Sequence, residues 1–219
     1  MNKATERIFS LPDRERAITI ALYGFIATFF FTSIYGYCNW HASLSPERIP
    51  MYADWELAIP IVPWMIFPYI SLNLLFLFAF FVIDDVKAIK GLCLALSISA
   101  VIAGIIFYFF PGELGYKRQV VSGYESLFNF MFSIDHPHNL FPSLHITYSS
   151  LTIWSMRHLK SGKMVRIFFD CWLLLITASV VLVHQHHLFD IATGFFLAVL
   201  VHFGFVKRYF LVSKYEQYF

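Results

Sequence analysis

Two short polar segments decide how this chain folds: FPSLH at residues 141–145 and HQHHLFD at residues 184–190. Each lies where an apolar run meets a polar loop, and one opens a hydrophobic segment while the other closes one. About forty residues separate them, which is enough for one helix, a turn and a second helix that returns. This hairpin is expected to bring two histidines, a serine and an aspartate together at one membrane surface.

The composition is that of an integral membrane protein. Of the 219 residues, 58% are hydrophobic, 20% are aromatic and 14% are charged, whereas a soluble domain carries about 25% charged residues. The net charge of +2 and the lack of a basic stripe argue against a nucleic-acid partner. The three cysteines lie in or beside apolar runs, which predicts buried thiols rather than a disulfide framework or a metal site.

The apolar segments predict an all-α fold, a bundle of six transmembrane helices that forms a single domain over residues 1–219. The expected spans are roughly residues 17–38, 59–83, 88–110, 142–157, 165–183 and 188–206. The first is interpreted as a spanning helix rather than a signal peptide, because it ends at no small-residue cleavage site. A long polar loop at residues 111–141 follows the third span, and its middle, residues 122–130, favours a short interfacial helix.

The distribution of lysine and arginine predicts the orientation in the membrane. With six spans, thirteen of the 16 Lys and Arg residues fall on the side of the termini, and only Arg48, Lys117 and Arg118 fall on the other. Cytoplasmic loops carry an excess of Lys and Arg, so both termini are expected in the cytoplasm. The long loop and both polar segments are then expected on the extracytoplasmic face, which is periplasmic or lumenal.

The residues expected at that face have the chemistry of a phosphate-handling site. His186 and Asp190 are four residues apart, a spacing that places both on one face of a helix. A carboxylate at one ring nitrogen fixes the tautomer and raises the basicity of the other nitrogen, which suits His186 as a nucleophile or general base. His145 is the candidate acid for protonating a leaving oxygen.

Candidate ligands for a phosphate lie beside these histidines. Pro142 and Ser143 suit the first turn of a helix, where free N–H groups attract an anion and Ser143 adds a hydroxyl donor. Arg118 and Lys117 are, apart from Arg48, the only cations expected on this face. A guanidinium group grips phosphate oxygens at two points, which makes Arg118 the stronger candidate.

Two other interpretations of these residues stay open. His184, His186 and His145 would form a zinc site if the three side chains converged, and activity would then be lost with a chelator. A transporter or flippase requires broken helices and charges at the bilayer centre, whereas this chain places its charges at the membrane edge.

The two polar segments resemble motifs of the type 2 phosphatidic acid phosphatase superfamily. That family carries Lys-x6-Arg-Pro, Pro-Ser-Gly-His and Ser-Arg-x5-His-x3-Asp. The second motif is matched at residues 142–145, with Leu144 in the glycine position. The third is matched at Ser179, His186 and Asp190, with Val180 in the arginine position.

The first motif of the family is degraded in this chain. Arg118 is the best candidate for its arginine, Gln119 follows in place of proline, and Pro111 stands where the lysine would fall. The leucine at position 144, the Gln-His run and the pattern Asp135-x-Pro137-x-Asn139 resemble the branch that contains inositol phosphorylceramide synthases and related bacterial enzymes.

The resemblance implies catalysis through a phosphohistidine. His186 is expected to attack phosphorus, Asp190 to orient His186, and His145 to protonate the departing group. The expected phosphate ligands, besides backbone N–H groups, are Arg118, Ser143 and, in place of the missing motif cations, Lys117 or a charged His184.

The implied activity is a membrane lipid-phosphate phosphatase that needs no metal or other cofactor. The alternative is a lipid phosphotransferase that passes the phosphoryl headgroup to an alcohol, as inositol phosphorylceramide synthases do. Phosphatidic acid, phosphatidylglycerol phosphate, polyprenyl diphosphate, a sphingolipid and a lipid A phosphate are all compatible substrates.

Overall fold

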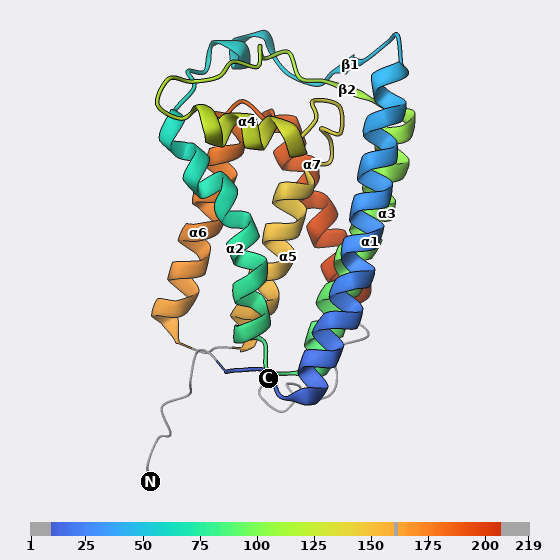
Figure 1. Cartoon of the computed structure of the whole chain (residues 1–219), viewed down its shortest axis with the longest axis vertical. Helices are drawn as coiled ribbons and strands as arrows, with labels where there is room; N and C mark the ends of the chain where they lie inside the picture. Colours follow the sequence, from blue (N-terminus) through green and yellow to red (C-terminus); the bar gives the residue numbers. More distant parts are fainter. Residues whose placement is uncertain (1–9, 160–161, 207–219) are drawn as a thin grey trace.

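The computed structural model describes residues 10–159 and 162–206, which form a bundle of long helices (Figure 1). The helices that run along the bundle are α1 (Arg14–Leu44), α2 (Ile66–Val82), α3 (Val86–Phe109), α5 (Leu144–Leu159), α6 (Lys163–Leu182) and α7 (Leu188–Val201). A π-helical turn, η3 (His202–Val206), continues α7. The start of α1 and the end of α7 lie at the same end of the bundle (Figure 1).

The opposite end of the bundle carries the short elements. Helix α4 (Glu125–Ile134) lies across this end (Figure 1), close to the interfacial helix expected over residues 122–130. The 3₁₀ turns η1 (Asp54–Ala58) and η2 (Pro63–Met65) precede α2. Strand β1 (Ile49–Pro50) pairs in parallel with β2 (Gly112–Glu113), so the loop after α1 is tied to the loop after α3.

Five segments are long and apolar enough to cross a membrane, which agrees with a multi-pass membrane protein. They are Arg14–Leu44, Pro63–Val82, Val86–Phe109, Lys163–Leu182 and Leu188–Phe205. The expected fourth span corresponds to α5, which has 16 residues and is not one of the five. The count of six spans is therefore not confirmed, and with α4 the described residues contain seven α-helices.

Helices α1 and α2 have other bounds than the first two predicted spans. Helix α1 has 31 residues and extends past both predicted ends of its span. The regular part of α2 starts at Ile66, seven residues later than predicted, because Pro60 and Pro63 lack the N–H groups that a helix interior needs. Arg16 at the other end donates to the carbonyls of Phe80 (3.2 Å) and Ile83 (3.1 Å), which satisfies the C-terminus of α2.

Helix α5 is the central helix, and its polarity explains why it is a poor membrane span on its own. It packs against α2, α3, α6 and α7. Four of its buried side chains are serine or threonine: Thr147, Ser149, Ser150 and Thr152. Small side chains let neighbouring helices approach closely, and Thr147 Oγ1 donates to the Gly194 carbonyl of α7 (2.9 Å).

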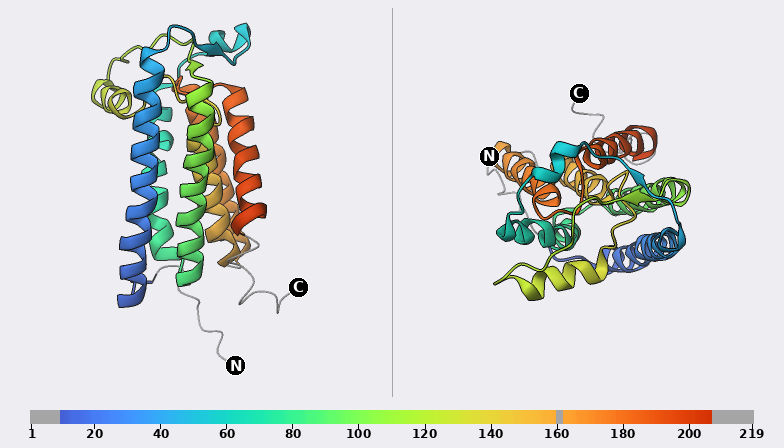
Figure 2. Two further views of the ribbon diagram at one scale, coloured as in Figure 1. Left: turned by 90° about the vertical axis from the view of Figure 1, so that its right-hand side faces the viewer. Right: turned by 90° about the horizontal axis from the view of Figure 1, so that it is seen from above.

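Helix α1 sits differently from the others. It packs along α3, and Figure 2 shows the two side by side at one edge of the bundle. The inner surface of α1 faces α2 across an apolar cavity rather than packing on it. This cavity leads to the end of the bundle where the two polar segments meet.

Candidate active site

The two polar segments meet where α5 and α7 begin. The backbone N–H of Ser143 donates to the carbonyl of Asp190 (3.0 Å), and α5 starts at the next residue. A Cβ placed on Gly194 would lie 2.6 Å from the carbonyl oxygen of Ser143, closer than real Cβ atoms come. Glycine at position 194 is therefore what lets α7 lie against the start of α5.

We expect the substitution Gly194→Ala to displace the start of α5. Overpacking of this kind costs about 1–3 kcal/mol, and the shift should also lower kcat because His145 follows Ser143 by two residues. Thermal unfolding and turnover of the purified protein measure both effects. Gly36→Ala is the matched control, because a Cβ at Gly36 meets nothing within 4 Å; equal effects at both positions would contradict the role of Gly194.

The loop between α6 and α7 turns His186 into the site. His184 has a left-handed backbone conformation, with φ of 59°, which is rare for residues other than glycine. The N–H groups of Gln185 (2.9 Å) and His186 (3.0 Å) then both donate to the Val180 carbonyl, which ends α6. This sharp turn leaves His186 nearly fully buried at the centre of the site.

His186 is held between a carboxylate and a second imidazole. Its Nδ1 lies 3.2 Å from Asp190 Oδ2, and its Nε2 lies 3.1 Å from His145 Nδ1. Asp190 is fixed in turn, because the same oxygen accepts the backbone N–H of His187 (2.9 Å) at the start of α7. The three predicted catalytic side chains therefore form one continuous hydrogen-bonded chain.

The carboxylate of Asp190 determines which ring nitrogens of His186 and His145 carry hydrogen. Asp190 accepts only, so His186 Nδ1 carries a hydrogen and Nε2 presents a lone pair. That lone pair accepts the Nδ1–H of His145. Burial lowers the pKa of His186 below its ordinary value, and the opposing effect of Asp190 does not cancel this shift. His186 is therefore neutral at physiological pH, as a nucleophile must be.

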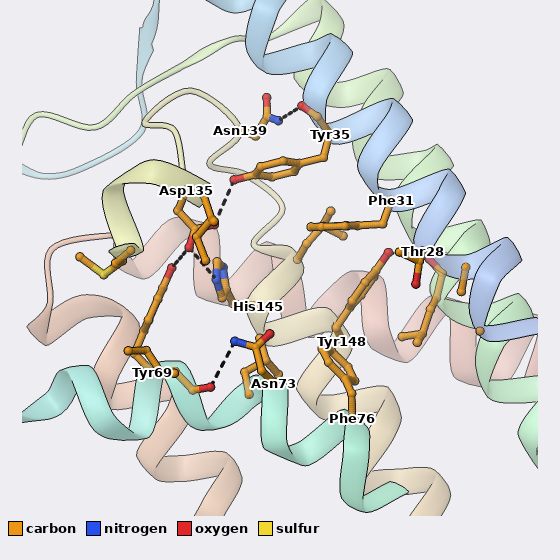
Figure 3. A pocket seen from close by; sticks show the side chains of 18 of the residues that line it. Thr28, Phe31, Tyr35, Tyr69, Asn73, Phe76, Asp135, Asn139, His145 and Tyr148 are labelled. Carbon is orange, nitrogen blue, oxygen red and sulfur yellow. Dashed lines mark hydrogen bonds and ion pairs between the residues drawn. The ribbon is translucent and has the colours of Figure 1, made fainter. Parts of the chain in front are cut away.

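Asp135 is a further carboxylate of this site, and no role was predicted for it. Its Oδ2 lies 3.7 Å from His145 Nε2 and accepts the hydroxyl of Tyr69, while Oδ1 lies 3.5 Å from the Tyr35 hydroxyl (Figure 3). Burial raises the pKa of Asp135, but the charge of His145 and the Tyr69 hydroxyl more than offset this and keep its pKa below the usual range. One signal was available, since Asp135 directly follows an apolar helix at the membrane edge.

Arg118 lies close to the site, but its guanidinium group is engaged by backbone oxygens. It donates to the carbonyl of Asp135 and, at 3.4 Å each, to the Phe132 carbonyl and the Gln185 side-chain oxygen. Its Nε is buried with no partner among the described residues. Arg118 thus closes the C-terminus of α4 and holds Asp135 in place, while its buried Nε–H is available to a ligand.

Of the other three predicted phosphate ligands, only Ser143 is both buried and free to bind an anion within the described part of the chain. Ser143 is fully buried and its hydroxyl has no hydrogen-bond partner within the described part of the chain, so it is available to an anion. Lys117 is exposed. His184 faces away, with Nε2 2.9 Å from the Ile59 carbonyl and its ring stacked on Tyr116 at 4.0 Å. Burial lowers the pKa of His184, which disfavours the charged form.

A lid formed by residues 49–62 and 111–124 covers the start of α7 (Figure 1). Glu56, in η1, is buried and accepts the N–H groups of Ala53 and Leu188, each at 2.9 Å. Its Oε2 also lies 3.4 Å from His187 Nδ1. No local sequence signal points to this role, because Leu188 lies 132 positions away from Glu56.

We expect Glu56→Gln to loosen the lid. The amide keeps the shape of the carboxylate, but it removes a charge that faces His187 and presents N–H groups to backbone donors. Breaking a buried pair of this kind costs about 3–5 kcal/mol. The drop in unfolding temperature in detergent measures the effect, and the exposed Glu47→Gln is the control. If both variants have the unfolding temperature of the wild type, Glu56 does not hold the lid.

An apolar cavity of about 490 Å³ ends at the histidine pair (Figure 3). Its apolar walls come from α1 and α2, with contributions from α3, α4 and α5, and include Phe31, Phe76, Leu96, Met131 and Tyr148. Its polar end is formed by Asp135, His145 and His186. The cavity therefore joins a hydrocarbon-like space to the candidate catalytic groups.

The three histidines of the predicted zinc alternative do not converge. His145 and His186 face each other, whereas His184 is directed to the Ile59 carbonyl. Within residues 10–159 and 162–206, no three His, Cys, Asp or Glu side chains are grouped as metal ligands.

The fold and this site define a multi-pass membrane protein with a pair of histidines, one buried and one half-buried, each facing a carboxylate. A model of the PAP2 superfamily matches residues 54–204, which is most of the chain and includes both polar segments. The chain belongs to the PAP2 superfamily, and membership indicates phosphatase or phosphotransferase activity. No curated protein and no solved structure shows significant similarity to it.

Proposed function

We propose that the protein is a membrane lipid-phosphate phosphatase that works through a phosphohistidine at the extracytoplasmic face. The observation that carries this proposal is the chain from Asp190 through His186 to His145 at the end of an apolar cavity. It supplies a nucleophile, a group that orients the nucleophile, and an acid within hydrogen-bond reach of one another.

In the first step, the Nε2 lone pair of His186 attacks phosphorus and the bond to the leaving oxygen breaks. His145 gives its Nδ1 proton to that oxygen, which departs as an alcohol or a phosphate. Asp190 balances the charge that develops on the ring of His186. Because His145 Nδ1 occupies the lone pair of His186 when no substrate is bound, the two rings must separate as the phosphoryl group enters.

In the second step, water attacks the phosphorus of the phosphohistidine. His145 Nδ1 takes a proton from the water as the bond between phosphorus and nitrogen breaks. Inorganic phosphate leaves, and both histidines return to their starting protonation states. The Ser143 hydroxyl and Arg118 Nε are buried and have no hydrogen-bond partner among residues 10–159 and 162–206. They are the donors that this proposal assigns to the phosphoryl oxygens. Lys117 and His184 stay untested as ligands.

The apolar cavity supports a lipid substrate. A soluble phosphate ester has no tail to fill a hydrocarbon-like space. A lipid tail fits it, because leaving hydrocarbon for water would cost the tail about 0.8 kcal/mol per methylene group. The tail would lie between α1 and α2, with the phosphate held against His145 and His186 at the polar end.

The charge distribution supports an extracytoplasmic site. Of the described cations, Arg14, Arg16, Lys87, Lys90, Lys163 and Arg166 belong to helix ends opposite α4. Only Arg48, Lys117 and Arg118 belong to the end that carries the site. By the positive-inside rule, this distribution supports an extracytoplasmic location for the end that carries α4.

A phosphotransferase is the second candidate, and the burial of the site favours it. His186 is 4% exposed and Asp190 is 1% exposed, and the lid covers this end of the bundle. An enzyme that passes a phosphoryl headgroup to an alcohol must keep water from taking it first. The first step is shared with hydrolysis, and the alcohol replaces water in the second.

The test is phosphate release from a panel of lipid phosphates by the wild type and His186→Ala, with and without chelator. The panel comprises phosphatidic acid, phosphatidylglycerol phosphate, polyprenyl diphosphate and lipid A phosphate. Addition of a labelled acceptor alcohol separates transfer from hydrolysis. Release that survives in His186→Ala, or that chelator abolishes, would overturn the phosphohistidine proposal.

A further inference from the structure

We propose that Asp135 is the positioning residue for the acid: its carboxylate holds a proton on His145 Nε2, so that Nδ1–H is the proton delivered to the leaving group. This inference rests on the phosphohistidine chemistry proposed above. It assigns a role to a loop residue that belongs to neither polar segment.

The geometry around His145 supports this assignment. Its Nε2 faces Asp135 Oδ2 at 3.7 Å, and its Nδ1 faces His186 Nε2 at 3.1 Å. Both ring nitrogens therefore face acceptors, which is the environment of an imidazolium rather than of a neutral ring. The ring of Tyr69 lies against His145, with centroids 4.9 Å apart, and limits its rotation.

Asp135 is itself held from several sides. Tyr69 from α2 and Tyr35 from α1 direct their hydroxyls at its carboxylate (Figure 3). Arg118 donates to its backbone carbonyl. A carboxylate fixed in this way can fix its imidazole partner, as carboxylates do behind metal-bound and catalytic histidines. Each imidazole of the site thus has its own carboxylate, Asp190 for His186 and Asp135 for His145.

The charged and titratable groups around His145 come from every neighbouring element. They are Tyr35 of α1, Tyr69 of α2, Asp135 after α4, His186 of the 183–187 loop and, behind Asp135, Arg118. Asp135 is the carboxylate in direct line with Nε2. Removal of its charge leaves His145 Nε2 facing uncharged groups and the more distant Arg118, so the ring loses the carboxylate that favours its protonated form.

The test is Asp135→Asn in the full-length protein in nanodiscs. The amide keeps the shape of the carboxylate and one acceptor oxygen, which can serve Tyr69 or Tyr35. We expect kcat to fall about 10–100-fold, the usual cost of losing an outer hydrogen-bond partner. The basic limb of the kcat profile should move to lower pH by about 1 unit, the smallest shift typical of a lost opposite charge. Asp135→Glu should restore part of kcat, and the exposed Asp54→Asn is the control.

A double-mutant cycle separates positioning from simple structural damage. In a His145→Gln background, Asp135→Asn should lower kcat no further, because the imidazole through which Asp135 acts is already absent. The inference would be overturned if the kcat losses of the two single variants multiplied in the double variant, or if Asp135→Asn left the pH profile of kcat unchanged. If Asp135→Asn fails to fold, Tyr69→Phe should give a smaller loss that also disappears in the His145→Gln background.

Failure of this inference is distinguishable from failure of the proposed function. A phosphoenzyme that forms in His186→Ala refutes the phosphohistidine, whatever the cycle shows. Multiplied losses at Asp135 and His145, together with an inactive His186→Ala, refute only the role of Asp135.

Discussion

His186→Ala should lower the rate of phosphate release by about 10⁴-fold or more, because removal of a nucleophile eliminates the covalent route rather than weakening it. The alanine also leaves no atom to carry the phosphoryl group. Rapid quenching of the enzyme with labelled lipid phosphate should trap an acid-labile, base-stable phosphoenzyme in the wild type and none in the variant.

His136→Ala is the matched control for this experiment. His136 is exposed in the loop that precedes α5 and is not one of the residues that line the cavity. It should form the phosphoenzyme at the wild-type level. A phosphoenzyme of undiminished amount in His186→Ala would show that another residue carries the phosphoryl group.

His145→Gln should reduce turnover of an alkyl phosphate by about 10²–10⁴-fold, the usual contribution of general acid catalysis. The amide side chain occupies a similar space and can still donate to His186, but it cannot supply a proton to an alkoxide. The loss in the burst rate should be smaller for an aryl phosphate, because its leaving group departs without protonation. Comparison of burst rates for a matched alkyl and nitrophenyl phosphate measures this difference.

The burst rate is the relevant measurement because, in the proposed mechanism, His145 also accepts a proton when water attacks the phosphohistidine. Steady-state turnover therefore stays low for both substrates, while the burst with the nitrophenyl ester should approach that of the wild type. Equal losses in the burst for the two leaving groups would show that His145 does not act as the acid.

The parts of the site that lie near each other in the sequence were predictable. The i, i+4 spacing of His186 and Asp190 gave their contact, and the hairpin between residues 145 and 186 gave the meeting of the two imidazoles. Apolar runs located the helices because the membrane requires them. The helical content and the multi-pass character followed from the same patterns.

The parts of the site that depend on loop paths were not predictable. Asp135 reaches His145 only because α4 lies across the bundle, and Glu56 reaches Leu188 through a lid that no periodicity describes. Arg118 was predicted to grip phosphate, but its contacts with the Phe132 and Asp135 carbonyls at the end of α4 could not be read from the sequence. Helix α5, with 16 residues, is shorter than the five membrane-spanning segments, and it tolerates serine and threonine because other helices surround it.

The cavity between α1 and α2 has a consequence for how the protein is handled. A surfactant with one straight alkyl chain matches a hydrocarbon-walled space that ends in polar groups, so micelles compete with the substrate for it. Solubilised preparations should then show an apparent KM that rises with surfactant concentration and falls when the protein is returned to vesicles. Co-purified lipid extracted from the sample and identified by its mass would report which tails the cavity accepts.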